Sequence, residues 1–537
     1  MTGSLRRRGT LLVLALAALG ALAVAAVAAA RTTAPAAAQV RNGGTLTIGL
    51  SEEPDALDPT LARTFVGRMV FMAMCEKLYD LDSHLNIVPQ LAASMPTVSK
   101  DKLTYTIKLR KGIKFNDGTP FNAAAVKTSL DRDLTLTGSV RASEISPVKS
   151  VTAQGSSTVV LHLSTPYSPL VSQLADRAGM VMSPKALAAE GTNFAQHPVC
   201  VGPFMFKDRV AGDHITLVKS PYYYAKNKVH LASIVYKIMT DPSARTQALR
   251  AGDIQVEDRI QSSDVPTLQK DKNVHVIKAV TIGYQGLTLN IGNKNGVLKG
   301  YSNVGTPIAK SRDVRAAFEL ALDRSTINKV VFGGLEQPGC FPIAPSSSWY
   351  AATTKGLPCN LHANVAQAKK LIQQSGIPTP ITVHLLLGGT DPVNARLGQV
   401  IQAMEKPIGI NVSIEATDFT TSLDRGTSGD FDTYAVGWSG RVDPDGNIYS
   451  FVASKGTLNY SGYSNPRLDY ILNGARKSLT TKSRDTLYHA ALQVINADKP
   501  LIYLYYPVDY FGVSKNVTGV QVYGDGLIRA QFAAFTK

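Results

Sequence analysis

The segment 437–451, "GWSGRVDPDGNIYSF", brings together a tryptophan, a serine, an arginine and two aspartates. The nucleophile turn of serine hydrolases, G-x-S-x-G, needs glycine at position 441, where this chain has arginine. A calcium loop needs glycine sixth and a bidentate carboxylate twelfth, but the run that starts at Asp443 has glycine fourth and Ser454 twelfth. The segment therefore matches neither motif.

Because the segment matches no catalytic or calcium motif, Trp438 and Arg441 are best interpreted as residues that could contact a bound molecule. A tryptophan offers a flat apolar face with one N–H donor, and an arginine offers a planar fork that suits a carboxylate or another anion. The alternative is that the tryptophan packs in the core while Arg441 pairs with Asp443 or Asp445 and shapes the loop. The residues alone do not decide between these interpretations.

Motifs for cofactor and metal chemistry are missing from the sequence. It contains no G-x-x-x-x-G-K-[ST], no G-x-G-x-x-G that opens a helix and no H-E-x-x-H, and its nine histidines are dispersed. A pair of carboxylates that acts on glycosides stays open, because its members need only meet in space. We therefore expect no cofactor and no metal, and a carboxylate pair is the one hydrolytic alternative.

The chain carries a net charge of +16, yet its basic residues do not form a stripe. The densest cluster is the arginine run at 6–8, and the other lysines and arginines are scattered among acids. Nucleic-acid binding needs a continuous basic surface that neutralises phosphates. We therefore expect no nucleic-acid partner.

The first residues are typical of an export signal. The arginines at 6–8 precede the apolar run 9–30, and small residues then offer cleavage sites that end at Ala30 or Ala38. An apolar run of about 20 residues is also long enough to cross a bilayer, so an uncleaved anchor is the alternative. Residues 1–38 are thus predicted to be a signal peptide or a membrane anchor, and the protein is predicted to work outside the cytoplasm.

Four cysteines lie far apart, without the C-x-x-C spacing of a zinc site. In an exported protein they favour disulfides. Cys340 and Cys359 bracket a loop rich in proline and serine, which a bridge would restrain; two free buried thiols are the alternative. Cys75 with Cys200 is a second pairing open to the chain.

Strand-like and helix-like segments alternate along the chain. In 103–110, apolar residues alternate with polar ones, as in a half-buried strand, and Asn122 is a good N-cap for the helix that follows. Later, "ITVHLLL", "VNARLGQVIQAMEK" and "INVSIEA" form a strand, helix and strand with the length of a right-handed parallel crossover. The fold class is therefore α/β, and 537 residues favour two or three domains.

Five colinear segments carry a resemblance to a known family: "GGTLTIGLSEEPDALDPT", "YTIKLRKGIKFNDGTPFNAAAVKTSL", "CVGPFMFKDRVAGDHITLVKSPYYY", "SRDVRAAFELALDRSTINKVVFGG" and "YSGYSNPRLDYIL". In this order they resemble the extracytoplasmic solute-binding proteins of ABC importers, in the large family that binds peptides, nickel complexes and related solutes. The resemblance covers the chain from about Gly43.

The resemblance implies the two-lobed fold of periplasmic binding proteins, with an additional domain inserted in the first lobe. Ligand is captured between the hinged lobes. Mapped onto this chain, lobe I comprises 43–84, 204–289 and 505–537, the inserted domain comprises 85–203, and lobe II comprises 290–504.

The same resemblance implies a ligand lining drawn from three places. These are the loop after "LDP", the crossing near "GYQGLTLN" and the loop after the Gly-Trp pair. The predicted ligand-binding residues are Arg63, Thr64, Phe65, Tyr284, Trp438, Ser439, Gly440 and Arg441.

The chain departs from the family in two respects. Lipoprotein members have a cysteine at the signal cleavage site, and this chain has none there. Peptide-binding members commonly have an aspartate three residues after the tryptophan, where this chain has Arg441. A cation in place of an anion predicts that the solute presents a carboxylate at that end.

We therefore expect a monomeric, non-catalytic receptor that delivers a small polar solute, an oligopeptide or a carboxylate-bearing compound, to an ABC permease. The alternatives are a secreted hydrolase that acts through a carboxylate pair and a receptor for a metal chelate.

Overall fold

The computed structural model describes residues 40–537, so the predicted signal or anchor, 1–38, lies outside the described residues. Asn42–Phe535 form one compact unit, and the site lies in it. Strand β1 (Val40–Arg41) and the last residues, Thr536–Lys537, fall outside that unit. Over the described residues, no helix combines the length and apolar character needed to span a bilayer.

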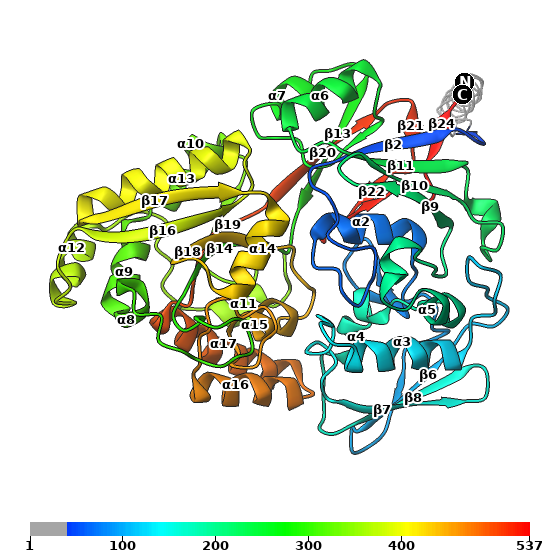
Figure 1. Cartoon of the computed structure of the whole chain (residues 1–537), viewed down its shortest axis with the longest axis horizontal. Helices are drawn as coiled ribbons and strands as arrows, with labels where there is room; N and C mark the ends of the chain where they lie inside the picture. Colours follow the sequence, from blue (N-terminus) through cyan, green and yellow to red (C-terminus); the bar gives the residue numbers. More distant parts are fainter. Residues whose placement is uncertain (1–39) are drawn as a thin grey trace, which may run out of the picture. The chain divides into compact units, whose positions relative to one another are not determined.

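The first sheet has seven strands in the order β13-β20-β12-β2-β11-β10-β9 (Figure 1). In β2, Leu46, Ile48 and Leu50 are fully buried and pack with the first helix, α2 (Phe65–Met74). The strands are β2 (Thr45–Leu50), β9 (Phe204–Val210), β10 (His214–Lys219), β11 (Ser233–Ile238), β12 (Val256–Glu257), β13 (Val274–Val280) and β20 (Val508–Ser514).

The second sheet has six strands in the order β15-β19-β14-β18-β16-β17. The predicted strand, helix and strand are β16, α13 (Pro392–Glu405) and β17, and the two strands pair in parallel, which confirms the crossover. The strands are β14 (Tyr284–Leu289), β15 (Gln337–Pro338), β16 (Ile381–Gly388), β17 (Ile410–Thr417), β18 (Thr433–Trp438) and β19 (Leu501–Tyr506).

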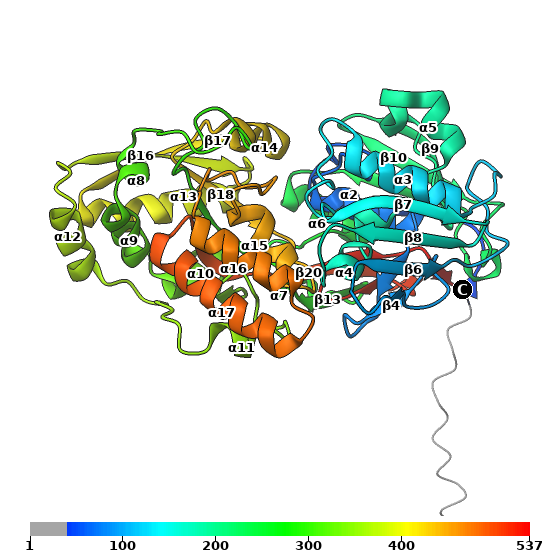
Figure 2. The ribbon, with the colours of Figure 1, turned by 90° about the horizontal axis from the view of Figure 1, so that it is seen from below.

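Residues 85–203, which are predicted to form the insert, contain a four-stranded sheet in the order β5-β6-β8-β7, with helix α3 (Ala123–Thr135) packed on it (Figure 2). The predicted alternation is confirmed, because Tyr105 and Ile107 are buried while Lys108 is exposed. Asn122 caps α3 by accepting a hydrogen bond from the Ala125 amide at 3.0 Å. The strands are β5 (Thr97–Val98), β6 (Thr104–Lys108), β7 (Val148–Gln154) and β8 (Thr158–Leu163).

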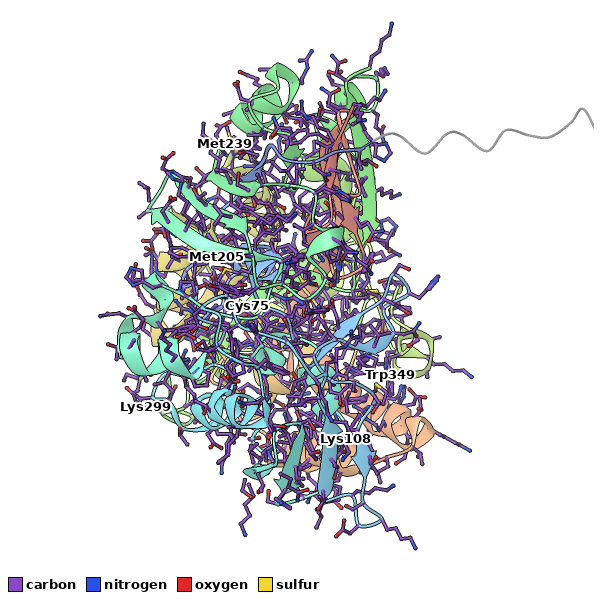
Figure 3. All side chains as sticks on the ribbon, turned by 90° about the vertical axis from the view of Figure 1, so that its right-hand side faces the viewer. Cys75, Lys108, Met205, Met239, Lys299 and Trp349 are labelled. Atoms are coloured by element: carbon purple, nitrogen blue, oxygen red, sulfur yellow. A yellow bond between two sulfur atoms is a disulfide. The ribbon has the colours of Figure 1, made fainter. Side chains whose placement is uncertain are left out.

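Both cysteine pairs form disulfides. Cys340 bonds Cys359 across the loop rich in proline and serine, and Cys75, which is buried (Figure 3), bonds Cys200 over a sequence separation of 125. The Cys75–Cys200 bond closes a covalent loop that contains most of the predicted insert. A disulfide over so long a loop restricts the unfolded chain.

Two strands cross side by side from one sheet to the other. β13 continues through 281–283 into β14, and β19 continues through Pro507 into β20 (Figure 1). The Thr281 amide and hydroxyl donate to the Pro507 carbonyl at 3.2 and 2.8 Å. The boundary between lobe I and lobe II was predicted after Leu289. That residue ends β14, which pairs with β18 in the second sheet, so the chain has already left the first sheet before this point. The apolar pattern runs through the crossing without a break and therefore does not mark the change of sheet.

The remaining elements cover the sheets or connect their strands. The helices are α4 (Leu170–Gln173), α5 (Pro184–Glu190), α6 (Pro242–Ala251), α7 (Val265–Leu268), α8 (Pro307–Lys310), α9 (Arg312–Ala321), α10 (Arg324–Phe332), α11 (Tyr350–Thr354), α12 (Val365–Gln374), α14 (Phe419–Ser428), α15 (Asp445–Val452), α16 (Pro466–Lys477) and α17 (Thr481–Asp498). The short strands are β3 (Tyr79–Leu81), β4 (Ile87–Pro89), β21 (Val517–Thr518), β22 (Gln521–Val522), β23 (Ile528–Arg529) and β24 (Ala534–Thr536).

Candidate functional site

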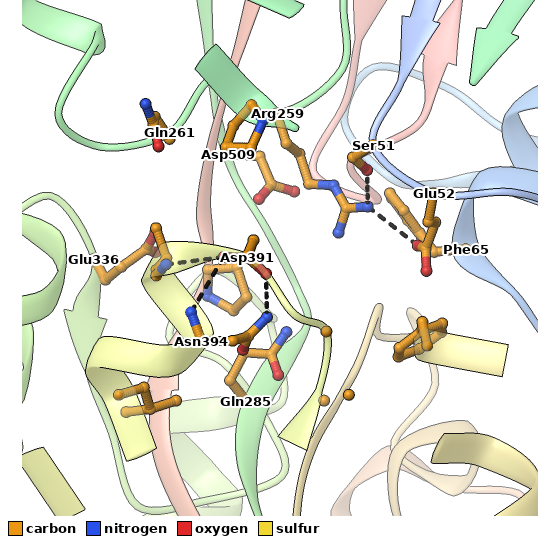
Figure 4. A pocket seen from close by; sticks show the side chains of 18 of the residues that line it. Ser51, Glu52, Phe65, Arg259, Gln261, Gln285, Glu336, Asp391, Asn394 and Asp509 are labelled. Carbon is orange, nitrogen blue, oxygen red and sulfur yellow. Dashed lines mark hydrogen bonds and ion pairs between the residues drawn. The ribbon is translucent and has the colours of Figure 1, made fainter. Parts of the chain in front are cut away.

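A cavity of about 780 Å³ lies at the strand crossing. Residues 281–286 and 504–510 form one wall, and the other walls come from loops at the strand ends of both sheets (Figure 4). A volume between 300 and 1,000 Å³ is usual for a small-molecule site. The polar lining includes Ser51, Glu52, Arg259, Gln261, Gln285, Glu336, Asp391, Asn394 and Asp509. We call this space the hinge cavity.

Two carboxyl groups give the hinge cavity an acidic side. The Glu336 carboxylate accepts a hydrogen bond from the Val508 amide at 2.6 Å, next to the crossing. Burial raises the pKa of Glu336 to about 8 despite that hydrogen bond, and the nearby Asp509 adds to the rise. Burial likewise raises the pKa of Asp509 to about 6, although Arg259 opposes it. Near neutral pH this side therefore changes its charge.

Arg259 is held by protein partners. Its guanidinium donates to the Ser51 hydroxyl at 2.6 Å and to Glu52 at 3.2 Å, and it lies 5.2 Å from the centre of the Phe65 ring. Burial alone would lower the pKa of Arg259, but Asp258 and Glu52 hold it above its usual value. Arg259 thus stays charged and neutralises part of the acidic lining.

The start of helix α13 also lines the hinge cavity. Asp391 caps this helix by accepting hydrogen bonds from the amides of Val393 at 2.9 Å and Asn394 at 3.1 Å. Its other oxygen accepts from the Asn394 side chain at 2.6 Å (Figure 4). Gly389 has a φ of +145°, and a Cβ there would lie 2.5 Å from the Asn394 amide nitrogen, so this turn requires glycine. The polar groups here are thereby fixed in place.

A second cavity of about 80 Å³ adjoins the first. The two share Phe65, Phe419 and the segment 436–439 at the end of β18. The small cavity is also lined by Arg63, Arg141, Arg177, Tyr284, Thr288, Leu423, Phe451, Leu458, Tyr460 and Leu501. We call this space the arginine cavity. Trp438 thus stands between an acidic space and a basic one.

Two arginines of the insert converge beside the arginine cavity. Arg177 is 1% exposed and donates to the carbonyl oxygens of Ala62 at 2.8 Å and Thr64 at 3.4 Å. Arg141 is 2% exposed, donates to the same Ala62 oxygen at 3.4 Å and pairs with Glu144 at 2.7 Å. Burial, and then the charge of Arg141, lower the pKa of Arg177 well below its usual value.

Trp438 is fixed by its neighbours. Its ring nitrogen donates to the Asn447 side chain at 3.1 Å, its ring meets Phe451 edge on at 5.0 Å, and the Arg441 guanidinium lies 4.3 Å from its centre. At Gly440 the φ of +81° and a carbonyl 2.3 Å from the position of a Cβ require glycine. The tryptophan is therefore part of the cavity wall and cannot rotate freely.

Arg441 pairs neither with Asp443 nor with Asp445. It forms an ion pair of 2.6 Å with Asp176 of the insert. Asp443 pairs with Arg484 of α17, and Asp445 pairs with Arg476 of α16, so the alternative of a pairing within the loop is wrong. Burial would raise the pKa of Asp176, but Arg441 and Arg68 hold it well below its usual value.

Further polar contacts join the insert and the first-sheet side to the second-sheet side. Arg63 donates to Asp424 of α14 at 3.0 Å. The hydroxyl groups of Ser143 and Thr457 lie 2.8 Å apart. These contacts join the two sides beside the arginine cavity.

The predicted ligand-binding residues fall into two groups. Arg63 and Tyr284 line the arginine cavity, and Phe65, Trp438 and Ser439 line both cavities. Thr64, Gly440 and Arg441 are not among the described lining residues. Instead, the Thr64 hydroxyl bonds Asp55 at 2.9 Å, Gly440 makes the turn, and Arg441 holds Asp176.

Sequence reasoning missed the insert arginines, Arg141 and Arg177, and the acidic pair Glu336 and Asp509. None of the four lies in a recognisable motif. Only the fold brings them to the cavities, since each is far along the chain from Trp438. Across the described residues, no group of three or more histidine, cysteine, aspartate or glutamate side chains is arranged to hold a metal ion.

Comparisons with known proteins agree with this architecture. The family model of bacterial extracellular solute-binding proteins, family 5, matches residues 86–459. The glutathione-binding protein GsiB of Pectobacterium atrosepticum is 27% identical over 493 residues, which are 90% of this chain and 92% of that protein.

Solved structures show the same fold. The periplasmic binding protein AgaA of A. tumefaciens R10, in complex with agropinic acid, superposes with a TM-score of 0.81 at 27% identity, covering 91% of this chain and 96% of that one. The ABC transporter-associated periplasmic binding protein DppA of Helicobacter pylori, in complex with the peptide STSA, has a TM-score of 0.83 at 24% identity, covering 93% and 99%.

These relatives are binding proteins and not enzymes, and they work outside the cytoplasm. The family model alone covers more than half of the chain. The chain therefore belongs to the bacterial extracellular solute-binding proteins of family 5, which capture a solute and deliver it to the permease of an ABC transporter.

Proposed function

We propose that this chain is a monomeric receptor that encloses a small, polar, peptide-like solute in the hinge cavity. The observation that carries the proposal is the position of this cavity at the strand crossing, with walls from both sheets. A rotation about the crossing would move one set of walls relative to the other, which is how hinged binding proteins admit and enclose a ligand. The crossing at 281–283 and Pro507 acts as the hinge.

The lining supports a solute that carries a positively charged or hydrogen-bonding group on the hinge side. Glu336 and Asp509 face this space, and Arg259 is already engaged by Ser51 and Glu52. A carboxylate near an ammonium group gains a charge-assisted hydrogen bond. Relatives of this chain bind glutathione and a peptide, and both names are compatible with such a group.

The experiment is binding without turnover. The purified protein is mixed with a library of di- and tripeptides and examined by thermal denaturation and small-angle scattering. A bound peptide should raise the unfolding free energy by about 2.7 kcal/mol at a hundred times its Kd, and the radius of gyration should decrease. Mass spectrometry should recover the peptide unchanged.

Three outcomes would contradict the proposal. Hydrolysis of the added peptide would favour a secreted hydrolase, and binding that depends on added nickel would favour a metal-chelate receptor. If saturating peptide left the radius of gyration unchanged, closure about the strand crossing would be contradicted. Sedimentation at several protein concentrations tests the monomer.

A further inference from the structure

We propose that Tyr167 and Ser168 of the predicted insert and Arg476 of α16 form a clasp that favours closure of the receptor even when no solute is bound. This inference deepens the proposed function and rests on it for the closing motion about the strand crossing, but its test needs no solute. None of the three residues is among the described lining residues of either cavity. They are positioning residues, which act on the two sides of the molecule and not on the solute.

The first argument is the end of helix α16. The last carbonyl groups of a helix have no partner within the helix. Ser168 supplies one from the predicted insert. Its amide donates to the Arg476 carbonyl at 2.9 Å, and its hydroxyl lies 2.7 Å from the Ser478 carbonyl and 3.0 Å from the Arg476 carbonyl. The predicted insert thus caps a helix of the second-sheet side.

The second argument is the side chain of Arg476, which is 5% exposed. Its guanidinium pairs with Asp445 at 2.8 Å and lies over the rings of Tyr449 and Tyr167, 3.3 and 4.9 Å from their centres. It also donates to the Tyr167 hydroxyl at 3.3 Å and to the Ser143 carbonyl at 3.4 Å. A cation over an aromatic ring is attracted most strongly where water is excluded. Separation of the two sides would admit water here, so this contact favours closure.

The third argument is that the contact is polar and can therefore separate. Leu170, which lies next to the clasp on the predicted insert, belongs to one hydrophobic cluster, and Leu472 and Ala475 of α16 belong to another. Over the described residues, neither cluster contains a residue of the other side. Interfaces between domains of one chain are more polar than permanent ones, and motion across them is expected. The clasp can thus break and re-form without disrupting either apolar core.

The clasp adds to the stability of the closed arrangement independently of the solute. A solute that binds only the closed arrangement has an apparent affinity proportional to the fraction of protein that is already closed. Part of the solute-free protein would be closed, and the solute would complete the closure. Weakening the clasp should lower the closed fraction and leave the solute-bound arrangement unchanged.

The test compares Ser168→Leu with the native protein, both at full length and without solute. Leucine removes the hydroxyl donor and adds bulk where the hydroxyl meets two carbonyl groups, so the two sides should separate more often. Small-angle scattering should give a larger radius of gyration for Ser168→Leu. Amide exchange in the segment 165–170, followed by mass spectrometry, should be roughly fivefold faster. Ser156→Leu places the same side chain in an exposed turn between β7 and β8 and should change neither quantity.

Tyr167→Phe tests the other half of the clasp and takes the place of Ser168→Leu if that variant does not fold. It removes the hydroxyl that accepts from Arg476 and should also increase the solute-free radius. A larger radius with native circular dichroism and cooperative unfolding identifies opening of the clasp, since an unfolded insert would change both. Equal solute-free radii for the native protein and both variants would overturn the clasp.

The outcomes separate this inference from the proposed function when the library of di- and tripeptides is added. If saturating peptide brings the native protein and Ser168→Leu to the same radius from different starting values, the clasp and the receptor are both supported. A larger solute-free radius in a variant of a protein that binds no peptide would support the clasp alone. Equal decreases from equal starting values would retain the receptor and overturn the clasp.

Discussion

The hinge cavity and the arginine cavity share a wall but differ in the origin and the state of their charges. The hinge cavity has half-buried carboxyl groups at strand ends, Glu336 and Asp509, whose protonation changes near neutral pH. The arginine cavity has buried guanidinium groups from the insert, Arg141 and Arg177, which are held by main-chain carbonyl groups and by Glu144. The acidic side changes its charge near neutral pH, whereas the guanidinium groups keep their charge there although burial lowers the pKa of Arg177.

This difference in charge suggests that the two cavities bind different groups of a solute. A side that changes its protonation can bind and release a cationic group as conditions change. A side that stays charged and buried selects for an anion, because any other occupant leaves its donors unpaired. The predictions that follow perturb one side at a time.

The largest effect is expected at the counter-charge of the arginine cavity. Asp176→Asn removes the ion-pair partner of Arg68 and Arg441 and should reduce the free energy of unfolding by about 3–5 kcal/mol, because it leaves buried cations unpaired. Urea denaturation measures the loss, and the exposed Asp213→Asn is the control. A variant as stable as the native protein would show that the arginines need no counter-charge.

The acidic side should make stability depend on pH. In the unfolded chain Glu336 ionises near its ordinary pKa of 4.5, and in the native protein near 8, so its contribution to stability is present below pH 4.5 and is lost as the pH rises through 8. Replacing it by Gln should remove a decline of roughly 2 kcal/mol between pH 5 and 8, after allowance for its partial exposure.

The measurement is urea denaturation of the native protein and of Glu336→Gln at several pH values. The quantity compared is the difference between the two proteins, since other acids such as Glu76 and Glu257 also have raised pKa values. If the difference in unfolding free energy between the two proteins did not change with pH, the pKa of Glu336 would not be raised in the native protein. Its carboxyl group would then be in contact with water.

A small cation should distinguish the two cavities. Methylammonium should bind the acidic side about tenfold more tightly at pH 9 than at pH 6, because Glu336 becomes ionised over that range. Equilibrium dialysis at both pH values measures the affinity, and Glu336→Gln should lose its pH dependence.

The smallest effect is expected at the shared wall. Trp438→Phe removes the hydrogen bond to Asn447 and weakens the contact with Arg441, and should cost about 1 kcal/mol of stability. Trp349→Phe is the matched control because Trp349 lies outside both cavities, and it leaves Trp438 as the sole tryptophan emitter. If methylammonium leaves that emission unchanged, it does not bind beside Trp438.

Local sequence patterns predicted several helices and strands correctly. The alternation at 103–110, the cap at Asn122 and the crossover of β16, α13 and β17 depend on neighbours in the chain, and the structure has all three. The strand crossing was harder to place, because β13 and β14 follow one another with the same apolar alternation and only pairing shows where the sheet changes.

The site was predictable only in part. The family resemblance led to Trp438 and Phe65 because it implies a ligand lining drawn from the loops in which they lie. It could not provide Asp176 as the partner of Arg441, or Arg141 and Arg177 as cavity residues, because these contacts join segments far apart in the sequence. A lone arginine in a chain with 56 lysines and arginines gives no local signal of such a contact.

Because the Cys75–Cys200 bond joins the chain on either side of the predicted insert, we expect this segment, here called the cassette, to be exchangeable. The Cα atoms of the two cysteines are 4.9 Å apart, a spacing between neighbouring strands, so a short turn could close the chain if the cassette were removed. Its removal would leave Arg68 and the carbonyl groups of Ala62 and Thr64 without their partners Asp176 and Arg177. Because Arg141 and Arg177 both lie inside the cassette, exchanging it for that of a relative would remodel the basic end of the cavity and leave the hinge and its acidic side in place.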